Sequence, residues 1–204
     1  AWVLRLDADE WFMPEALEEL KEKLPALPPD VTGVIHKRRH IFLGRWMKHG
    51  VYPVKLLRLF RYGAARCEQR HMDEHMELSR GRAVEFEHDF VDENLNGLGW
   101  WAHKHVDYSA RELADLEDIL SSAAADSGIN GQAERKRAMK ERYARQPLFW
   151  RSFAYFCYRY FLKLGFLDGR EGFLWHFMQG WWYRTLVDAR QFEKQKKGSG
   201  KTAR

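Results

Sequence analysis

The chain opens with the run Ala1-Trp2-Val3-Leu4-Arg5-Leu6-Asp7-Ala8-Asp9-Glu10. The apolar residues from Trp2 to Leu6 predict a buried strand, and acidic residues follow it directly. Pro14 then stands where a helix would start, and apolar residues recur at helical spacing as far as Leu24. We therefore expect Asp7 and Asp9 to lie in a turn that leads from a strand into a helix.

The predicted secondary structure changes near residue 94, from mixed strands and helix to helices alone. Further strands are predicted at 33–37, 54–60 and 83–86, with a polar loop or short helix between Arg66 and Gly81. Helices are predicted at 94–126, 132–145, 147–165 and 170–193. The expected fold class is therefore α/β, with an α/β part over 1–93, a helical extension over 94–193 and a disordered basic tail over 194–204.

Composition excludes several classes of protein. Hydrophobic residues make up 45% of the 204 residues and charged residues 31%, which excludes an intrinsically disordered chain and a fibrous repeat. Only two cysteines occur, Cys67 and Cys157, so neither a disulfide framework nor a paired-cysteine zinc site is expected. This usage favours a reducing compartment.

Positive charge is concentrated in one part of the chain. The net charge is +5, and residues 133–163 hold nine basic side chains and two acidic ones. Arg151, Arg159 and Lys163 fall on one side of the helix predicted over 147–165, and aromatic residues occupy much of the rest. This pattern is typical of a helix that lies on an anionic membrane surface, while the alternative is a packed hairpin with an aromatic core. No nucleic-acid reader motif accompanies the basic residues, so no nucleic-acid partner is expected.

Two acidic motifs are candidates for chemistry. Asp7 and Asp9 end an apolar strand, and two carboxylates in such a turn can hold a divalent cation whose shell is completed by diphosphate oxygens. The alternative is that these acids only decorate a helix N-terminus, where the dipole favours them.

The second motif runs from His71 to His75. Its spacing is that of an inverted zinc-hydrolase motif built on His71, Glu74 and His75, but such a motif needs a sustained helix and Gly81 follows too soon. Asp73 and Glu74 are otherwise candidates for a general base that deprotonates a hydroxyl group. The remaining alternative is an ordinary polar loop.

The ordered set of motifs resembles family 2 glycosyltransferases. The residues that carry the resemblance are Trp2-Val3-Leu4, Leu6-Asp7-Ala8-Asp9-Glu10, Gly44-Arg45-Trp46, Leu57-Arg58-Leu59-Phe60, Asp73-Glu74-His75, His88, Lys104-His105, Tyr108-Ser109 and Gly165-Phe166-Leu167-Asp168-Gly169. The subgroup is the bacterial one, similar to enzymes that build lipopolysaccharide cores and exopolysaccharides. The resemblance extends from Trp2 to about Glu193.

The resemblance implies a GT-A fold and inverting transfer of a sugar from a nucleotide-diphosphate donor to a glycan or lipid-linked acceptor. Asp7 and Asp9 match the family's Asp-x-Asp motif, which holds Mg²⁺ or Mn²⁺. Glu74 stands at the position of the catalytic base, and Asp73 is the second choice. The expected contacts to diphosphate or acceptor are Trp46, Arg58, His88 and Lys104.

One departure from the family pattern concerns the start of the chain. Family members begin with a nucleotide-binding half that precedes the Asp-x-Asp strand, and this sequence opens at that strand. We therefore expect a fragment that alone binds the donor poorly or not at all. The parent enzyme is expected in the cytoplasm, peripheral at the inner face of the cytoplasmic membrane. The alternative function is a non-catalytic membrane-binding module.

Overall fold

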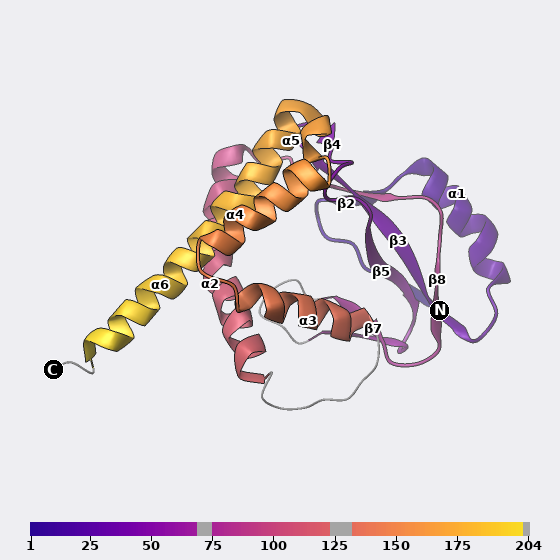
Figure 1. Ribbon diagram of the computed structural model, residues 1–204. Helices are drawn as coiled ribbons and strands as arrows, with labels where there is room; N and C mark the ends of the chain where they lie inside the picture. The colour runs from indigo at the N-terminus through magenta and orange to yellow at the C-terminus, as the bar shows by residue number, and fades with distance from the viewer. Residues whose placement is uncertain (69–74, 123–131, 202–204) are drawn as a thin grey trace. The chain divides into compact units, whose positions relative to one another are not determined.

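The computed structural model describes residues 1–68, 75–122 and 132–201 of a mixed α/β chain (Figure 1). Its strands are β1 (Trp2–Leu4), β2 (Glu10–Phe12), β3 (Val31–Phe42), β4 (Arg45–Trp46), β5 (Val54–Arg61), β6 (Ala65–Cys67), β7 (Met76–Leu78), β8 (Arg82–Glu85) and β9 (Phe90–Glu93). Its helical elements are α1 (Pro14–Lys23), η1 (Leu24–Ala26), α2 (Leu98–Ser122), α3 (Gln132–Ala144), α4 (Trp150–Cys157), η2 (Tyr158–Leu162), η3 (Gly165–Asp168), α5 (Gly169–Trp175), η4 (His176–Trp182) and α6 (Tyr183–Lys201).

The described residues divide into two compact units. The first, here called the sheet unit, consists of residues 1–68, 75–95 and 163–173. The second, the helical unit, consists of residues 96–122, 132–162 and 174–201. The segment 163–173 therefore groups with the sheet, whereas the sequence predicts that it belongs to the helical extension.

The sheet is mixed and is organised around the long strand β3. Strands β4 and β5 pair with β3 in antiparallel fashion, and β8 and β9 pair with it in parallel. Antiparallel β1 and β2 complete the order β1-β5-β3-β9-β2. A separate antiparallel pair is formed by β6 and β7.

Helix α1 packs against the sheet (Figure 1). Pro14 stands in its first turn with Glu15, and Lys21 and Lys23 lie in its last turn, an arrangement that suits the helix dipole. Leu20 contacts two clusters of buried apolar residues, which are Phe12, Ala16, Leu56 and Phe90 in one and Val34, Leu59 and Phe86 in the other. The predicted helix start at Pro14 and the predicted strands over 54–60 and 33–37 are thus confirmed.

Two strands change the setting of the predicted motifs. The sequence predicts that the acidic turn leads directly into a helix, but β2 lies between Asp9 and α1 because its residues pair with β9. The acids therefore do not decorate the N-terminus of α1. The sequence also predicts a loop or short helix between Arg66 and Gly81, but Met76–Leu78 forms β7 because it pairs with β6.

The helical unit has its own apolar core. Leu116 of α2, Ala144 of α3 and Tyr183 and Val187 of α6 are buried together. Helix α6 runs to Lys201, so the prediction of a disordered tail from residue 194 is wrong for the described residues. Ion pairs of Lys194 with Glu117 and of Lys197 with Glu193 accompany this extension of the helix.

The predicted basic stripe on the helix after Pro147 is also wrong in part. Arg151 points into the helical unit, is buried, and forms an ion pair with the buried Asp188. Its charge is therefore satisfied within the protein and is not presented to a membrane. In the part of the chain that the structure describes, no helix is long and apolar enough to cross a bilayer.

Candidate functional site

The turn between β1 and β2 presents two carboxylates beyond the end of β1. The amide of Glu10 donates to the carbonyl of Asp7 over 3.0 Å, and the amide of Asp7 donates to Oε2 of Glu10 over 3.1 Å. The amide of Glu93 in β9 donates to the carbonyl of Asp9 over 3.0 Å. These bonds hold the backbone of the turn while the side chain of Asp7 stays 56% exposed.

A buried ion pair supports this turn. Nη2 of Arg58, which comes from β5, donates to Oε1 of Glu10, and both side chains are almost completely buried. The same nitrogen lies 3.5 Å from Oδ2 of Asp7. The guanidinium group stands 5.1 Å from the centre of the Phe90 ring. Arg58 therefore links the acidic turn to the core of the sheet.

Asp92 in β9 lies opposite Glu10 in the β2–β9 pairing and adds another carboxylate beside the turn. Burial raises the pKa of Glu10, and the charges of Asp7 and Asp92 act in the same direction. Burial would also raise the pKa of Asp92, but contact with His40 and the charges of His40, Arg38 and Arg58 outweigh it, so this pKa is lowered. Opposed shifts in neighbouring carboxyl groups are typical of functional sites.

Asp7 and Asp9 are the residues of this turn that carry donor atoms suited to a divalent cation. Carboxylate oxygens are the hard ligands that Mg²⁺ and Mn²⁺ prefer, and Asp7 and Asp9 supply them from one short turn. Among the described residues, no group of three or more His, Cys, Asp or Glu side chains is placed to hold a metal by itself. Two carboxylates fill only part of a cation's coordination shell, so a cation held here needs further oxygens, such as those of a diphosphate.

Trp46 belongs to a second polar cluster of the sheet unit, near the end of β3. Its ring lies 4.0 Å from the guanidinium carbon of Arg39 and 4.7 Å from Nζ of Lys48. Arg39 also donates to Asp89, which accepts a further hydrogen bond of 3.1 Å from the hydroxyl of Tyr52. Two cations thus lie beside the indole ring of Trp46.

The other expected contact residues lie in different surroundings. The backbone amide of His88 donates to Oε2 of Glu19 over 2.9 Å, which fixes the loop before β9. Lys104 lies in α2, with Nζ 4.8 Å from the ring of Trp100 and 5.4 Å from that of Tyr108. Lys104 belongs to the helical unit, whereas Asp7, Arg58, Trp46 and His88 belong to the sheet unit.

The predicted base residues Asp73 and Glu74 lie outside the described residues, as does His71. His75 is described, and its carbonyl accepts a hydrogen bond of 2.8 Å from the amide of Glu68. Strand β7 begins at Met76, so the chain does not continue as a helix beyond His75. The inverted zinc motif requires such a helix, and the structure therefore gives this alternative no support.

Sequence reasoning missed Glu10, Asp92 and His40 as members of the site, and it missed a contact between His49 and Asp168. Asp168 is buried; it accepts a hydrogen bond of 2.8 Å from the amide of His49 and lies 2.7 Å from Nδ1 of the same residue. These contacts join positions far apart in the sequence, so no local pattern could reveal them. The Gly-Phe-Leu-Asp-Gly motif was a signal that the sequence did offer. The structure explains its last glycine, because Gly169, directly after Asp168, has a φ of +71°.

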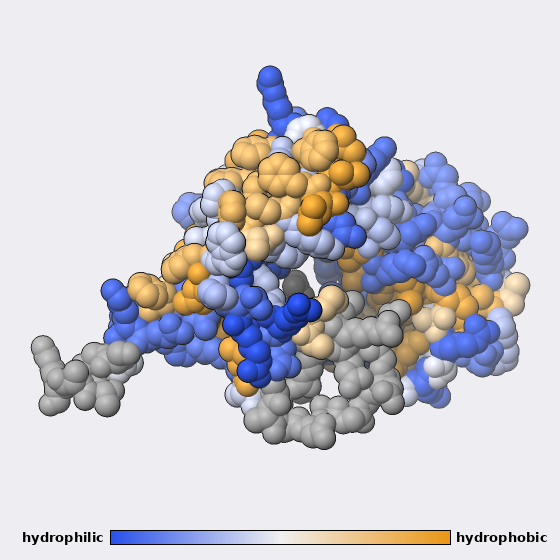
Figure 2. All heavy atoms as spheres, viewed as in Figure 1, coloured by the Kyte–Doolittle hydropathy of each residue, from blue (hydrophilic) through white to orange (hydrophobic). Residues whose placement is uncertain are grey.

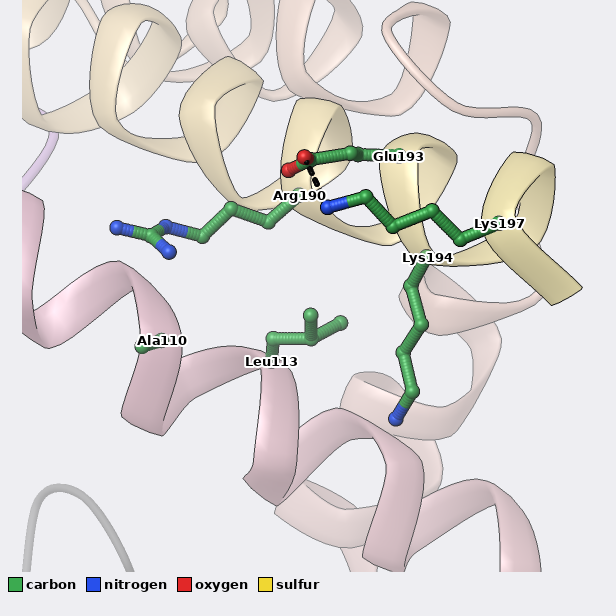
Figure 3. A pocket seen from close by; sticks show the side chains of 6 residues that line it. All are labelled: Ala110, Leu113, Arg190, Glu193, Lys194 and Lys197. Carbon is green, nitrogen blue, oxygen red and sulfur yellow. Dashed lines mark hydrogen bonds and ion pairs between the residues drawn. The ribbon is translucent and has the colours of Figure 1, made fainter.

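A hollow of about 270 Å³ lies between α2 and α6 of the helical unit (Figure 3). It is lined by Ala110, Leu113, Arg190, Glu193, Lys194 and Lys197. Arg190 donates to Oγ of Ser109, and Lys194 and Lys197 form ion pairs with Glu117 and Glu193. These cations have protein partners, so the hollow offers no stronger candidate site than the acidic turn.

No protein-family model matches this sequence, and no solved structure matches it. The interpretation of the acidic turn therefore rests on its residues and on their geometry.

Proposed function

We propose that this chain carries the acceptor half of a metal-assisted inverting glycosyltransferase with a GT-A-like fold. The observation that carries the proposal is the acidic turn after β1, where Asp7 and Asp9 are held by backbone hydrogen bonds and by the buried Arg58–Glu10 pair. The donor is a nucleotide-diphosphate sugar. The acceptor is a hydroxyl group of a glycan or of a lipid-linked saccharide, such as a lipopolysaccharide or exopolysaccharide precursor.

The turn binds the leaving group in this proposal. Asp7 and Asp9 hold Mg²⁺ or Mn²⁺, which when bound stabilises the negative charge that develops on the departing diphosphate. Arg58 pairs with Glu10 and lies 3.5 Å from Oδ2 of Asp7, so it ties the exposed carboxylate of the turn to the sheet.

The base acts on the other side of the sugar. Glu74, or Asp73 in its place, takes the proton of the acceptor hydroxyl, whose oxygen forms the new bond to the anomeric carbon. The bond from that carbon to the diphosphate oxygen breaks, and the nucleoside diphosphate leaves. Attack from the opposite face inverts the configuration at this carbon. Trp46 and His88, which both belong to the sheet unit, are proposed to position substrate.

The test is an assay of nucleoside diphosphate release by the natural protein that contains these residues, with a panel of nucleotide sugars and Mn²⁺. Asp9→Asn should lower turnover by about a hundredfold, because it removes a metal ligand. Asp107→Asn, which changes an exposed acid in α2, is the matched control and should leave turnover unchanged. Equal turnover in the two variants would remove the acidic turn from the mechanism.

A second pair of variants tests the base. Glu74→Gln should abolish transfer while donor binding is kept, since a general base contributes about a hundredfold or more to the rate. If Glu74→Gln keeps its turnover and Asp73→Asn loses it, the role belongs to Asp73. Turnover that survives in both variants would contradict this part of the proposal.

A further inference from the structure

A buried carboxylate and a partly exposed imidazole meet in the sheet unit. Asp168 ends the short element η3 and is buried, and His49 lies in the loop between β4 and β5. Oδ1 of Asp168 lies 2.7 Å from Nδ1 of His49, and Oδ2 accepts a hydrogen bond of 2.8 Å from the backbone amide of His49. Both carboxylate oxygens of Asp168 therefore contact the same residue, 119 positions away in the chain.

The neighbouring residues hold Asp168 in one position. Nη2 of Arg45 donates to the carbonyl of Leu167 over 3.4 Å, and Nη1 of Arg45 lies 3.6 Å from Oε2 of Glu171. At Gly172 a Cβ would stand 2.6 Å from Cβ of Asp168, so the lack of a side chain there lets the backbone pack directly against this residue. The carboxylate is therefore fixed by the fold itself.

The contact with Asp168 determines which nitrogen of the His49 ring carries the proton. Carboxylate oxygens only accept hydrogen bonds, so Nδ1 is the donor, and in the neutral ring Nε2 then keeps its lone pair. The side chain of His49 is 37% exposed, while that of Asp168 is 3% exposed. Because Nδ1 lies against the buried carboxylate, the exposed part of the ring is the opposite edge, which contains Nε2. The backbone hydrogen bond alone would join the two segments, so the second contact sets the plane and the tautomer of the ring.

Apolar residues are exposed next to Asp168 in the sequence. Phe166 is 44% exposed and Leu167 is 50% exposed. Figure 2 shows hydrophobic residues gathered in the region of α5, the helix that follows Asp168. Water competes less well for a hydrogen bond beside apolar side chains, so a hydrogen bond that His49 makes at this place is stronger than one in open water.

We propose that His49 accepts a hydrogen bond from a hydroxyl group of the saccharide acceptor, and that Asp168 positions its ring for this contact. An imidazole nitrogen with a lone pair accepts from a hydroxyl group, and a carboxylate on the other ring nitrogen fixes the ring and makes it a stronger acceptor. The base of the proposed reaction is a different group, so His49 binds the acceptor and does not take its proton. The inference rests on the proposed sugar transfer for the identity of the ligand, and on the geometry alone for the fixed tautomer.

The tautomer of His49 can be measured in this chain without any saccharide. Long-range ¹H–¹⁵N NMR spectra should place the ring proton on Nδ1 when the ring is neutral. In Asp168→Asn the backbone amide of His49 can still donate to the asparagine oxygen, and the asparagine NH₂ group then faces Nδ1. The proton should therefore move to Nε2. A proton on Nε2 in the unchanged chain would overturn the proposal.

Diethyl pyrocarbonate gives a second measurement in the same chain, because it modifies an imidazole nitrogen that has an accessible lone pair. Mass spectrometry should find His49 modified, and the reaction should be slower by about tenfold or more in Asp168→Asn, where the proton occupies Nε2. His103, an exposed histidine of α2, is the internal control and should react at the same rate in both chains. Equal rates at His49 in the two chains would contradict the fixed tautomer.

The variant His49→Asn separates ligand binding from structure. Its side chain can still donate to Asp168 from the place of Nδ1, but it has no group in the place of Nε2. In the nucleoside diphosphate assay of the natural protein, KM for the acceptor saccharide should rise about tenfold or more while kcat stays nearly unchanged. The thermal unfolding midpoint should equal that of the unchanged protein. His103→Asn is the matched control and should change neither constant.

The outcomes distinguish this inference from the proposed function. An unchanged KM for the acceptor in His49→Asn would reduce the pair to a clamp for η3 and overturn the proposal. Absence of transfer by the unchanged protein would contradict the proposed function, and with it the saccharide as the ligand of His49. The tautomer and the modification rates would in that case still decide whether Asp168 positions the ring.

Discussion

The strands of the sheet unit bury mainly apolar side chains, whereas helix α4 of the helical unit buries two polar side chains beside Phe156. In the sheet unit, Val31, Val34 and Phe90 are buried and the carboxylate of Asp7 is exposed. In α4, Arg151 and Ser152 are buried and Trp150 is exposed. Both units bury an ion pair, Arg58–Glu10 in the sheet unit and Arg151–Asp188 in the helical unit, but in α4 the buried polar residues outnumber the buried apolar one.

Removal of the buried cation in α4 should have the largest effect. Arg151→Met leaves the carboxylate of Asp188 buried without its main partner, which should cost about 3–5 kcal/mol of unfolding free energy. Adding Asp188→Asn should restore part of the loss, because the amide leaves no buried charge and can still accept from the amide of Phe149. Urea unfolding of the three chains measures both changes.

An exposed ion pair of the sheet unit provides the control. Lys21 and Glu18 form a pair in α1 in which both side chains are largely exposed. Lys21→Met should leave the unfolding midpoint nearly unchanged, since exposed pairs contribute little. If Arg151→Met proved as mild as Lys21→Met, the idea that α4 depends on a buried ion pair would be wrong.

Acid should weaken the sheet unit through His36. This side chain is fully buried between the rings of Phe12 and Phe86, and burial lowers the pKa of His36 from 6.5 to about 4. Neither ring nitrogen has a hydrogen-bond partner among the described residues. Below pH 6.5 His36 therefore binds a proton in the unfolded chain but stays neutral in the folded chain. The free energy of unfolding is highest above this pH and falls as the pH drops toward 4, by at most about 3 kcal/mol.

The variant His36→Leu isolates this contribution. It removes the titrating group and keeps an apolar side chain in the same position. The pH dependence of its unfolding free energy between pH 6.5 and 4 should be flatter than that of the unchanged chain. Identical slopes in the two chains would show that His36 does not carry the acid sensitivity.

Substitutions at two glycines should have effects of opposite sign. At Gly172 in the sheet unit, a Cβ would stand 2.6 Å from Cβ of Asp168 and 2.7 Å from the carbonyl oxygen of Gly165. Gly172→Ala should cost about 1–3 kcal/mol and disturb the contact of Asp168 with His49. At Gly99 in α2 a Cβ would meet nothing within 4 Å, so Gly99→Ala should stabilise the chain by about 0.5 kcal/mol. Thermal unfolding of both variants distinguishes the signs, and a stabilised Gly172→Ala would contradict the packing described for this segment.

Much of the fold could be predicted where local pattern and burial agree. Pro14 and the helical spacing after it predict α1, and the apolar run from Val54 predicts β5. The short strands β2 and β9 could not be predicted in this way, because they exist through their pairing with each other and with β3. The grouping of 163–173 with the sheet depends on the long-range contact between Asp168 and His49.

Some residues of the candidate site could likewise be predicted from the local sequence pattern, and others could not. Asp7 and Asp9 could be proposed from the sequence, because they follow a strand directly and stand two positions apart. Glu10, Asp92 and His40 could not, since the register that places Asp92 beside both of the others is set by the sheet. The burial of Arg151 was equally hidden, because a helical wheel does not reveal that Asp188 lies on the side to which Arg151 points.

The proposed function requires the turn after β1 to bind a divalent cation through Asp7 and Asp9. Paramagnetic broadening of backbone amide signals by Mn²⁺ tests it most directly in this chain, without any nucleotide. We expect the amide signals of Ala8, Asp9, Glu10 and Glu93 to broaden first as Mn²⁺ is added. Asp9→Asn should remove this selectivity. Broadening spread evenly over exposed acidic residues, or unchanged in Asp9→Asn, would contradict it.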